Sequence, residues 1–256
     1  MTNLKFDNPE QWPTWLVAQR SAFEGVGLDV VAPLSTGAWA RAQAERPGIG
    51  TIDSHGRTDA IALVVGNTRA AWPRWLDALA ARPDLRDSAD PIDRCTDAWL
   101  AEVVAASPVA TTVHPAWRVG DGAVSMLRAA ELAGLAHVGP AHLAVHPAHG
   151  PWFAIRAVVT YDAPWSLPAP PPAPDPCTGC SAPCVDAMRA ATPDGSAPTA
   201  AGVADRWRAW VAVRDACPVG RPARYDDAQV RYHYTRDAGV LAEAIAHRST
   251  AAHDPS

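Results

Sequence analysis

The chain has 256 residues, enough to bury a substantial core within one large domain. Hydrophobic residues make up 48% of it and charged residues 19%, which is typical of a globular rather than a disordered protein. The net charge is −5 and no basic run stands out, so the long-range attraction that nucleic-acid binding needs is missing. We therefore expect no nucleic-acid partner.

The first residues, MTNLKFDNPEQWPTW, lack a basic region followed by a long apolar run and do not resemble a secretory signal. No stretch approaches the roughly eighteen uninterrupted apolar residues of a membrane span. The sequence therefore predicts a soluble cytoplasmic protein without membrane contact. Five cysteines do not suggest a secreted disulfide framework, and four of them lie in the last third of the chain.

In the first half of the chain, apolar spacing predicts helices around one buried strand. Residues Pro9–Glu24 place tryptophan, leucine and phenylalanine side chains on one helical face. The run DAIALVVG, Asp59–Gly66, is almost wholly apolar, as in a central strand buried on both faces. Two helices are expected next, over Thr68–Ala81 and Pro91–Ala106, and Cys95 on the second should be a small buried hydrophobe.

The following segments predict strands and a hairpin. ATTVHP, Ala110–Pro115, is expected to be extended and to lead to a helix over Ala123–Ala136. The runs AHLAVHP and WFAIRAVVTYD, separated by the turn AHG, predict two hairpin strands.

A proline-rich stretch separates these strands from the last helices. Residues 165–175 hold so many prolines that neither helix nor sheet is expected there. We expect one domain formed by residues 1–164 and 197–247, a connector and cysteine loop over 165–196, and a flexible tail over 248–256. Helices are predicted over Thr199–Asp215 and Asp226–His247.

The motif CTGCSAPC places Cys177, Cys180 and Cys184 within eight residues, close enough to share one metal or cluster. The bacterial ferredoxin run spaces its cysteines by two, two and three residues, whereas here the second gap holds three residues and Met188 occupies the fourth position. Cys217, which precedes a proline, could supply a fourth thiolate. A single iron–sulfur cluster, a zinc ion and free thiols all remain open.

Two separated segments resemble the cobalamin-processing MMACHC (CblC) family. HPAHGPWFAIRAVVT, His146–Thr160, is similar to that family's central strand, and RWRAWVAVRDA with ARYDDAQVRYHYT, within Arg206–Thr235, is similar to its next conserved block. DPIDRC, Asp90–Cys95, is a weaker third match, so the resemblance covers about residues 60–240. The segment AAELAGLAHVGPAHLAVHPAHGPWF also resembles the epoxyqueuosine reductases, which pair a corrinoid with iron–sulfur clusters and carry a cysteine motif after this strand.

The resemblance implies an α+β fold of the flavin-reductase-like (nitroreductase-like) type, with an antiparallel-dominated sheet flanked by helices and a Pro/Cys-rich insert. It implies cobalamin bound with its lower base displaced, followed by removal of the upper ligand through reductive decyanation or thiol-dependent dealkylation. Glutathione, another thiol or a reduced flavin (FMN or FAD) would be the second reactant. It does not identify a catalytic residue or say which upper ligand is removed.

In the MMACHC family the corrinoid contacts come largely from the backbone of the strand before the central one. The corresponding residues here are Ala141, His142, Leu143, Ala144 and Val145, with His137 and Trp152 as further expected contacts. A strand edge offers amides that pair with the side-chain amides of a corrin. The family histidine near the displaced base falls on Glu131, so His137 or His142 is left as a candidate lower ligand.

Two family arginines that hold glutathione match Arg156 and Arg214. Guanidinium groups suit this role because each binds a carboxylate through two charged hydrogen bonds. A third family arginine falls near Val240, and Arg236 is the nearest substitute. The alternative for Arg156 is an ordinary ion pair on a strand.

Three functions follow from these observations. The first is a corrinoid-processing enzyme. The second is an iron–sulfur corrinoid-dependent reductase. For this function the resemblance to the epoxyqueuosine reductases favours a [4Fe–4S] cluster over zinc. The third is a non-catalytic carrier that passes cobalamin to a receiving enzyme. The sequence leaves open whether two chains form a homodimer.

Overall fold

The structure is a computed structural model that describes residues 11–193, 195 and 199–251. Its contacts divide the chain into two compact units. The first unit comprises residues 1–68, 96–137 and 154–174, and the second comprises residues 69–95, 138–153 and 175–256. The single domain expected from the sequence stays a prediction. None of the helices in the described part of the chain combines the length and apolar character that a membrane crossing requires.

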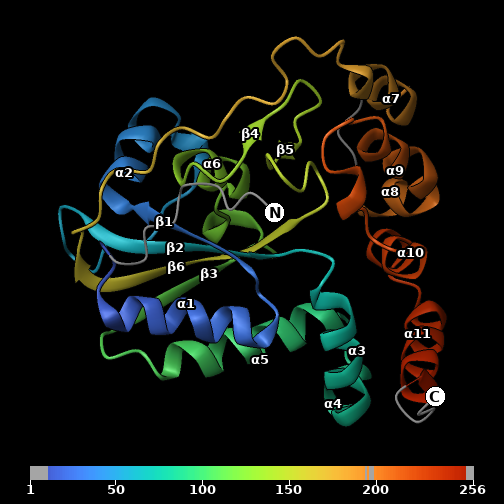
Figure 1. Cartoon of the computed structure of the whole chain (residues 1–256), viewed down its shortest axis with the longest axis horizontal. Helices are drawn as coiled ribbons and strands as arrows, with labels where there is room; N and C mark the ends of the chain where they lie inside the picture. Colours follow the sequence, from blue (N-terminus) through green and yellow to red (C-terminus); the bar gives the residue numbers. More distant parts are fainter. Residues whose placement is uncertain (1–10, 194, 196–198, 252–256) are drawn as a thin grey trace. The chain divides into compact units, whose positions relative to one another are not determined.

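A four-stranded sheet forms the centre of the first unit (Figure 1). Its strands, in spatial order, are β1 (Val30–Ser35), β2 (Ala60–Asn67), β6 (Ala154–Pro164) and β3 (Thr111–Pro115). All three pairings are antiparallel, with Val64 opposite Val158 and Val113 opposite Val159. Every residue of β2 is buried, which confirms the central strand expected from its apolar run.

Helices cover both faces of this sheet. In Figure 1, α1 (Thr14–Val26) and α5 (Pro91–Ala105) lie on one side, and α2 (Thr36–Glu45) and α6 (Met126–Leu132) lie on the other. The core between α1, α5 and the sheet includes Leu16, Phe23, Leu63, Val159 and Tyr161. The sequence therefore correctly predicts an antiparallel sheet flanked by helices.

The second unit is mainly helical. Its helices are α3 (Ala71–Ala81), α4 (Pro83–Arg86), α7 (Pro183–Ala191), α8 (Ala200–Asp205), α9 (Trp207–Asp215), α10 (Asp227–Thr235) and α11 (Ala238–Ala251). Short 3₁₀ turns occur at Pro47–Ile49, Gly120–Gly122 and Arg221–Ala223. Residues 248–251 of the predicted tail continue α11, where Arg248 pairs with Asp77 at 2.9 Å, and residues 252–256 lie outside the described residues.

Several predicted helix limits change. The helix expected from Pro9 begins at Thr14, and Pro9 itself lies outside the described residues. The helix expected over Ala123–Ala136 covers only Met126–Leu132. The last two predicted helices are each divided into two, at Arg206 and at Arg236, and Arg236 adopts a left-handed conformation with φ 53°.

The predicted hairpin is wrong. β6 pairs with β2 and β3, whereas β5 (Ala144–Val145) pairs with β4 (His137–Val138). Only an isolated bridge between His146 and Gly150 remains from the predicted pairing. Remote strands bury the apolar residues of β6 more completely than a short neighbour could, so the local turn does not decide its partner.

Candidate functional site

The segment expected to contact the corrinoid is mostly a turn. Only Ala144 and Val145 are strand residues, because the amide of Gly139 donates to the carbonyl of Leu143 at 2.9 Å and closes a tight turn. His142 has a φ of 54°, and its amide donates to the carbonyl of Gly139 at 2.9 Å. The five-residue strand predicted here is therefore wrong. Pro140 has no amide hydrogen and favours a turn at this point.

The side chains of this turn differ in exposure. Ala141 and Val145 are buried, Leu143 and Ala144 are half-buried, and His142 is exposed. β5 belongs to a two-stranded sheet, so its outer edge faces away from β4. Such an edge offers backbone donors and acceptors to a ligand.

His146 lies directly after β5 and is only 8% exposed. Its Nδ1 accepts hydrogen bonds from the amides of Ala148 at 3.1 Å and His149 at 3.2 Å. Its ring packs edge-on against Phe153, with centroids 5.6 Å apart. Burial, with a smaller effect from His149, lowers the pKa of His146 to about 4. The imidazole is therefore neutral near pH 7, with its proton on Nε2.

The low pKa of His146 predicts a loss of stability in acid. The unfolded chain takes up a proton near pH 6.5 and the folded chain only near pH 4, so the stabilisation is complete above pH 6.5 and falls as the pH drops. Between pH 7 and pH 5 this should cost about 2 kcal/mol. His146→Asn keeps an acceptor for the two amides but does not titrate. Urea unfolding should show a shallower pH dependence for the variant, and equal pH slopes would contradict the assignment.

Trp152 is only 1% exposed and belongs to a cluster in the second unit with Val211, Tyr225 and Val230. Its ring lies 5.5 Å from the guanidinium carbon of Arg214 and 5.4 Å from that of Arg224. Trp152 thus positions two arginines through cation–π contacts. Its predicted contact with a corrinoid stays a prediction.

The three arginines predicted to bind a thiol lie in different surroundings. In the first unit, the Nε of Arg156 donates to the Oδ1 of Asn67 at 2.7 Å. In the second unit, Arg214 lies between the rings of Trp152 and Tyr234. Arg236 pairs with Asp93 at 3.3 Å and with Asp90 at 3.8 Å. Arg236 is therefore already bound to two carboxylates of the protein.

A narrow cavity in the second unit is lined by four cysteines, Cys177, Cys180, Cys184 and Cys217. Residues of the 139–145 turn form another part of its wall. Burial is the main cause that raises the pKa of the Cys177 and Cys217 thiols. The Asp175 carboxylate raises the pKa of Cys177 further, and nearby thiols add to the effect at both residues. The fifth cysteine, Cys95, is 1% exposed on α5, where burial raises its pKa to about 12. The prediction that Cys95 is a buried hydrophobe is confirmed.

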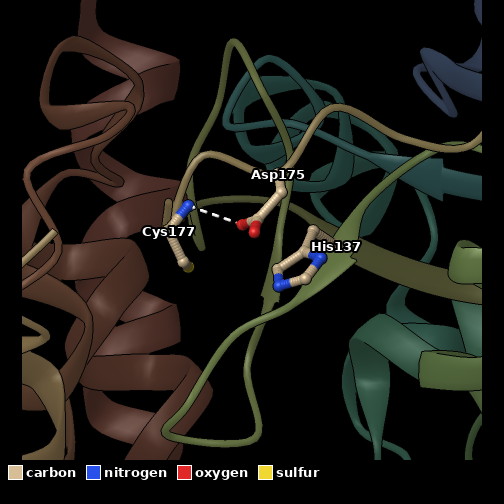
Figure 2. A group of neighbouring side chains, drawn as sticks. All are labelled: His137, Asp175 and Cys177. Atoms are coloured by element: carbon tan, nitrogen blue, oxygen red, sulfur yellow. Dashed lines mark hydrogen bonds between the residues drawn. The ribbon is translucent and has the colours of Figure 1, made fainter. Parts of the chain in front are cut away.

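The cysteine loop begins with a side-chain cap. Figure 2 shows the carboxylate of Asp175, which accepts from the amide of Cys177 at 2.8 Å. The other oxygen of Asp175 accepts from the hydroxyl of Thr178 at 2.8 Å. The amide of Cys180 then donates to the carbonyl of Cys177 at 3.0 Å, so the loop has a defined shape. His137, also drawn in Figure 2, belongs to the first unit and is the last residue of its segment 96–137.

The sequence interpretation missed an open groove in the second unit. Its volume is about 640 Å³, and its lining includes Trp207, Arg208, Val211, Arg224, Asp227 and Arg231. Arg224 is paired with Asp215 at 2.8 Å and with Asp227 at 2.9 Å. The volume suits a small molecule, and arginine beside an indole ring suits an anionic planar one. The dense arginine and tryptophan pattern of RWRAW was the available signal.

No protein-family model matches the sequence, and no curated protein matches it either. Among solved structures, the chain is similar to the B12-trafficking protein CblC of C. elegans, a homologue of human MMACHC. The TM-score is 0.61 at 13% identity, over 91% of this chain and 96% of that one.

Two epoxyqueuosine reductase structures are also similar. One, with a modified tRNA-Tyr stem loop, has a TM-score of 0.47 at 12% identity over 88% of this chain and 70% of that one. The other, from Bacillus subtilis, has a TM-score of 0.44 at 12% identity over 82% and 66%. The chain therefore has the α+β fold of CblC, as its resemblance to the MMACHC family predicts.

Proposed function

We propose that the chain binds a cobalamin-type corrinoid as substrate and removes its upper axial ligand. The observation that carries this proposal is the likeness to CblC, a B12-trafficking protein, along nearly the whole length of both chains. Two sequence segments, His146–Thr160 and Arg206–Thr235, resemble the MMACHC family in the same order. The outer edge of β5 and the partly exposed turn before it supply backbone groups suited to the amides of a corrin.

Two routes would release the upper ligand. In the first, a thiolate attacks the alkyl carbon, the cobalt–carbon bond breaks with its electron pair left on cobalt, and a thioether leaves. In the second, a reduced flavin gives one electron to Co(III), and cyanide leaves as Co(II) forms. Arg214, held against two aromatic rings, is suited to orient a carboxylate of the thiol.

Cobalamin titration tests the binding step. We expect methylcobalamin and cyanocobalamin to shift to the base-off absorption spectrum when the protein is added. Cobinamide, which lacks the lower base, is the matched control ligand and should bind at least as tightly. His142→Asn removes one candidate lower ligand, but asparagine tolerates the left-handed backbone and the backbone contacts remain, so equally tight binding would exclude His142 as the lower ligand. An unchanged spectrum at saturating protein would refute the proposal.

Turnover separates an enzyme from a carrier. Added glutathione or reduced flavin should convert bound methylcobalamin or cyanocobalamin at a rate that depends on protein concentration. If the base-off complex forms but keeps its upper ligand with both reactants present, the chain is a carrier that delivers cobalamin to a receiving enzyme.

A further inference from the structure

The cavity lined by the four cysteines contains one kind of metal donor. Apart from the thiols, its wall consists of glycine, alanine, leucine, valine and proline residues. Hard cations such as Mg²⁺ and Ca²⁺ need carboxylate or carbonyl oxygens, whereas thiolates select zinc or iron–sulfur clusters. The donor set therefore fits a soft centre and excludes a magnesium or calcium site.

Backbone amides point at two of the sulfur atoms. The amide of Ala182 donates to the Sγ of Cys180 at 3.4 Å, and Ala182 adopts a left-handed conformation with φ 53° to do so. The amide of Val219 hydrogen-bonds the thiol of Cys217 in the same way, two residues further along the chain. Amides of this kind stabilise metal-bound thiolates and tune clusters. The strain at Ala182 is consistent with a conformation held for binding.

The origin of the four ligands matches one class of cluster. Three cysteines come from the single run Cys177–Cys184, and the fourth comes from a distant Cys-Pro pair, Cys217 with Pro218. In bacterial ferredoxins the cysteine that precedes proline likewise completes a cluster held by a separate cysteine run. Met188 stands where the ferredoxin run has its fourth cysteine. The site still has a fourth thiol, because the fold brings Cys217 to the same cavity.

The sulfurs do not form a preformed tetrahedral zinc site. Tetrahedral zinc, with Zn–S bonds of ~2.3 Å, holds its thiolates about 3.8 Å apart. Within the described residues, no three cysteine sulfurs lie within 4.8 Å of one another. A [4Fe–4S] core attaches each thiolate to a different iron, so its four ligand sulfur atoms lie farther apart than those of a zinc site.

We propose that Cys177, Cys180, Cys184 and Cys217 bind one [4Fe–4S] cluster. The proposal stands on residues of the second unit alone and goes beyond corrinoid processing. Ala141, Leu143 and Val145 form part of the same cavity wall. If the proposed function holds, the cluster lies directly behind the turn that contacts the corrinoid.

Gly139 lets this turn approach the ligand set. A Cβ built on Gly139 would lie 3.2 Å from the Sγ of Cys177 and 3.3 Å from the Cγ2 of Val145. Alanine at position 139 would therefore press on one proposed ligand without removing it. This offers a test of the site that leaves all four cysteines in place.

Iron and sulfide analysis of the whole chain tests the proposal. After anaerobic reconstitution with iron and sulfide, the wild-type protein should be brown and hold about four irons and four sulfides per chain. The variants Cys180→Ser and Cys217→Ser should each lose at least nine-tenths of the iron. Cys180 lies in a half-buried loop, so its substitution should leave the fold intact. Cys95→Ala is the matched control and should keep it, because Cys95 does not line the cavity. Gly139→Ala should reduce the iron content.

Each other outcome overturns part of the assignment. One zinc per chain in a colourless protein, or no metal after reconstitution, would refute the cluster. Full iron in Cys217→Ser would exclude Cys217 as the fourth ligand. Circular dichroism of each variant separates loss of metal from loss of fold. Cobalamin titration of Cys180→Ser is independent of iron, so failure of the cluster and failure of corrinoid binding are distinguishable.

Discussion

Replacing Gly150 by alanine is expected to lower the free energy of unfolding by about 3 kcal/mol, from the left-handed backbone and the steric overlap together. Gly150 has a φ of 56°, and a Cβ built on it would lie 2.0 Å from the carbonyl oxygen of Val219. Gly220, with a φ of 72°, faces it, since its own Cβ would lie 2.1 Å from the carbonyl carbon of His149. Val219 lines the same cavity as Cys217, so a shift of this backbone would also disturb the cysteine site.

Gly179→Ala is the matched control for this prediction. Gly179 lies in the same unit with a φ of 76°, but a Cβ built there meets nothing within 4 Å. It should therefore cost only the conformational strain, about 1 kcal/mol. Urea unfolding of both variants measures the difference. Equal losses for Gly150→Ala and Gly179→Ala would show that the close approach of the two backbones contributes nothing.

The elements predicted well from sequence are those whose local pattern and tertiary role agree. The run at Ala60–Asn67 is apolar throughout because the strand is buried on both faces, so its pattern needs no further context. The edge strand β1, Val30–Ser35, was missed, because Pro33 within it argues against a strand although edge positions tolerate proline. Whether a strand lies at the edge or in the centre of the sheet is not known until its pairing with other strands is known.

The hairpin error has the same origin. A Gly-containing turn between two apolar runs predicts local pairing, but β6 finds longer partners in β2 and β3. Strand pairing depends on contacts remote in sequence, which a single sequence does not reveal. The sequence therefore predicts a strand where the structure has the turn over residues 139–143.

The candidate site was partly visible in the sequence. The spacing of Cys177, Cys180 and Cys184 indicates metal chemistry, because neighbouring thiols on one loop can meet without knowledge of the fold. The position of Cys217 depends on how α9 packs, so only the structure places it on the same cavity. The groove that contains Arg208 and Arg224 was missed for the same reason.

Trp152→Ala is expected to destabilise the protein by about 3–5 kcal/mol, because the indole fills the centre of a buried cluster. Its ring packs edge-on against Tyr225, with centroids 5.6 Å apart, and alanine would leave a cavity there. Arg214 and Arg224 would also lose the face on which they rest.

Trp207→Ala is the control for this prediction, because Trp207 is only partly buried and stacks 4.5 Å from Arg208 at the groove. It should cost about 1 kcal/mol. Thermal and urea unfolding compare the two variants. Trp152→Phe should recover much of the loss, because phenylalanine keeps an aromatic face for both arginines. If Trp152→Ala were no more harmful than Trp207→Ala, the buried indole would not be the main support of this cluster, and its cation–π contacts with Arg214 and Arg224 would contribute little to stability.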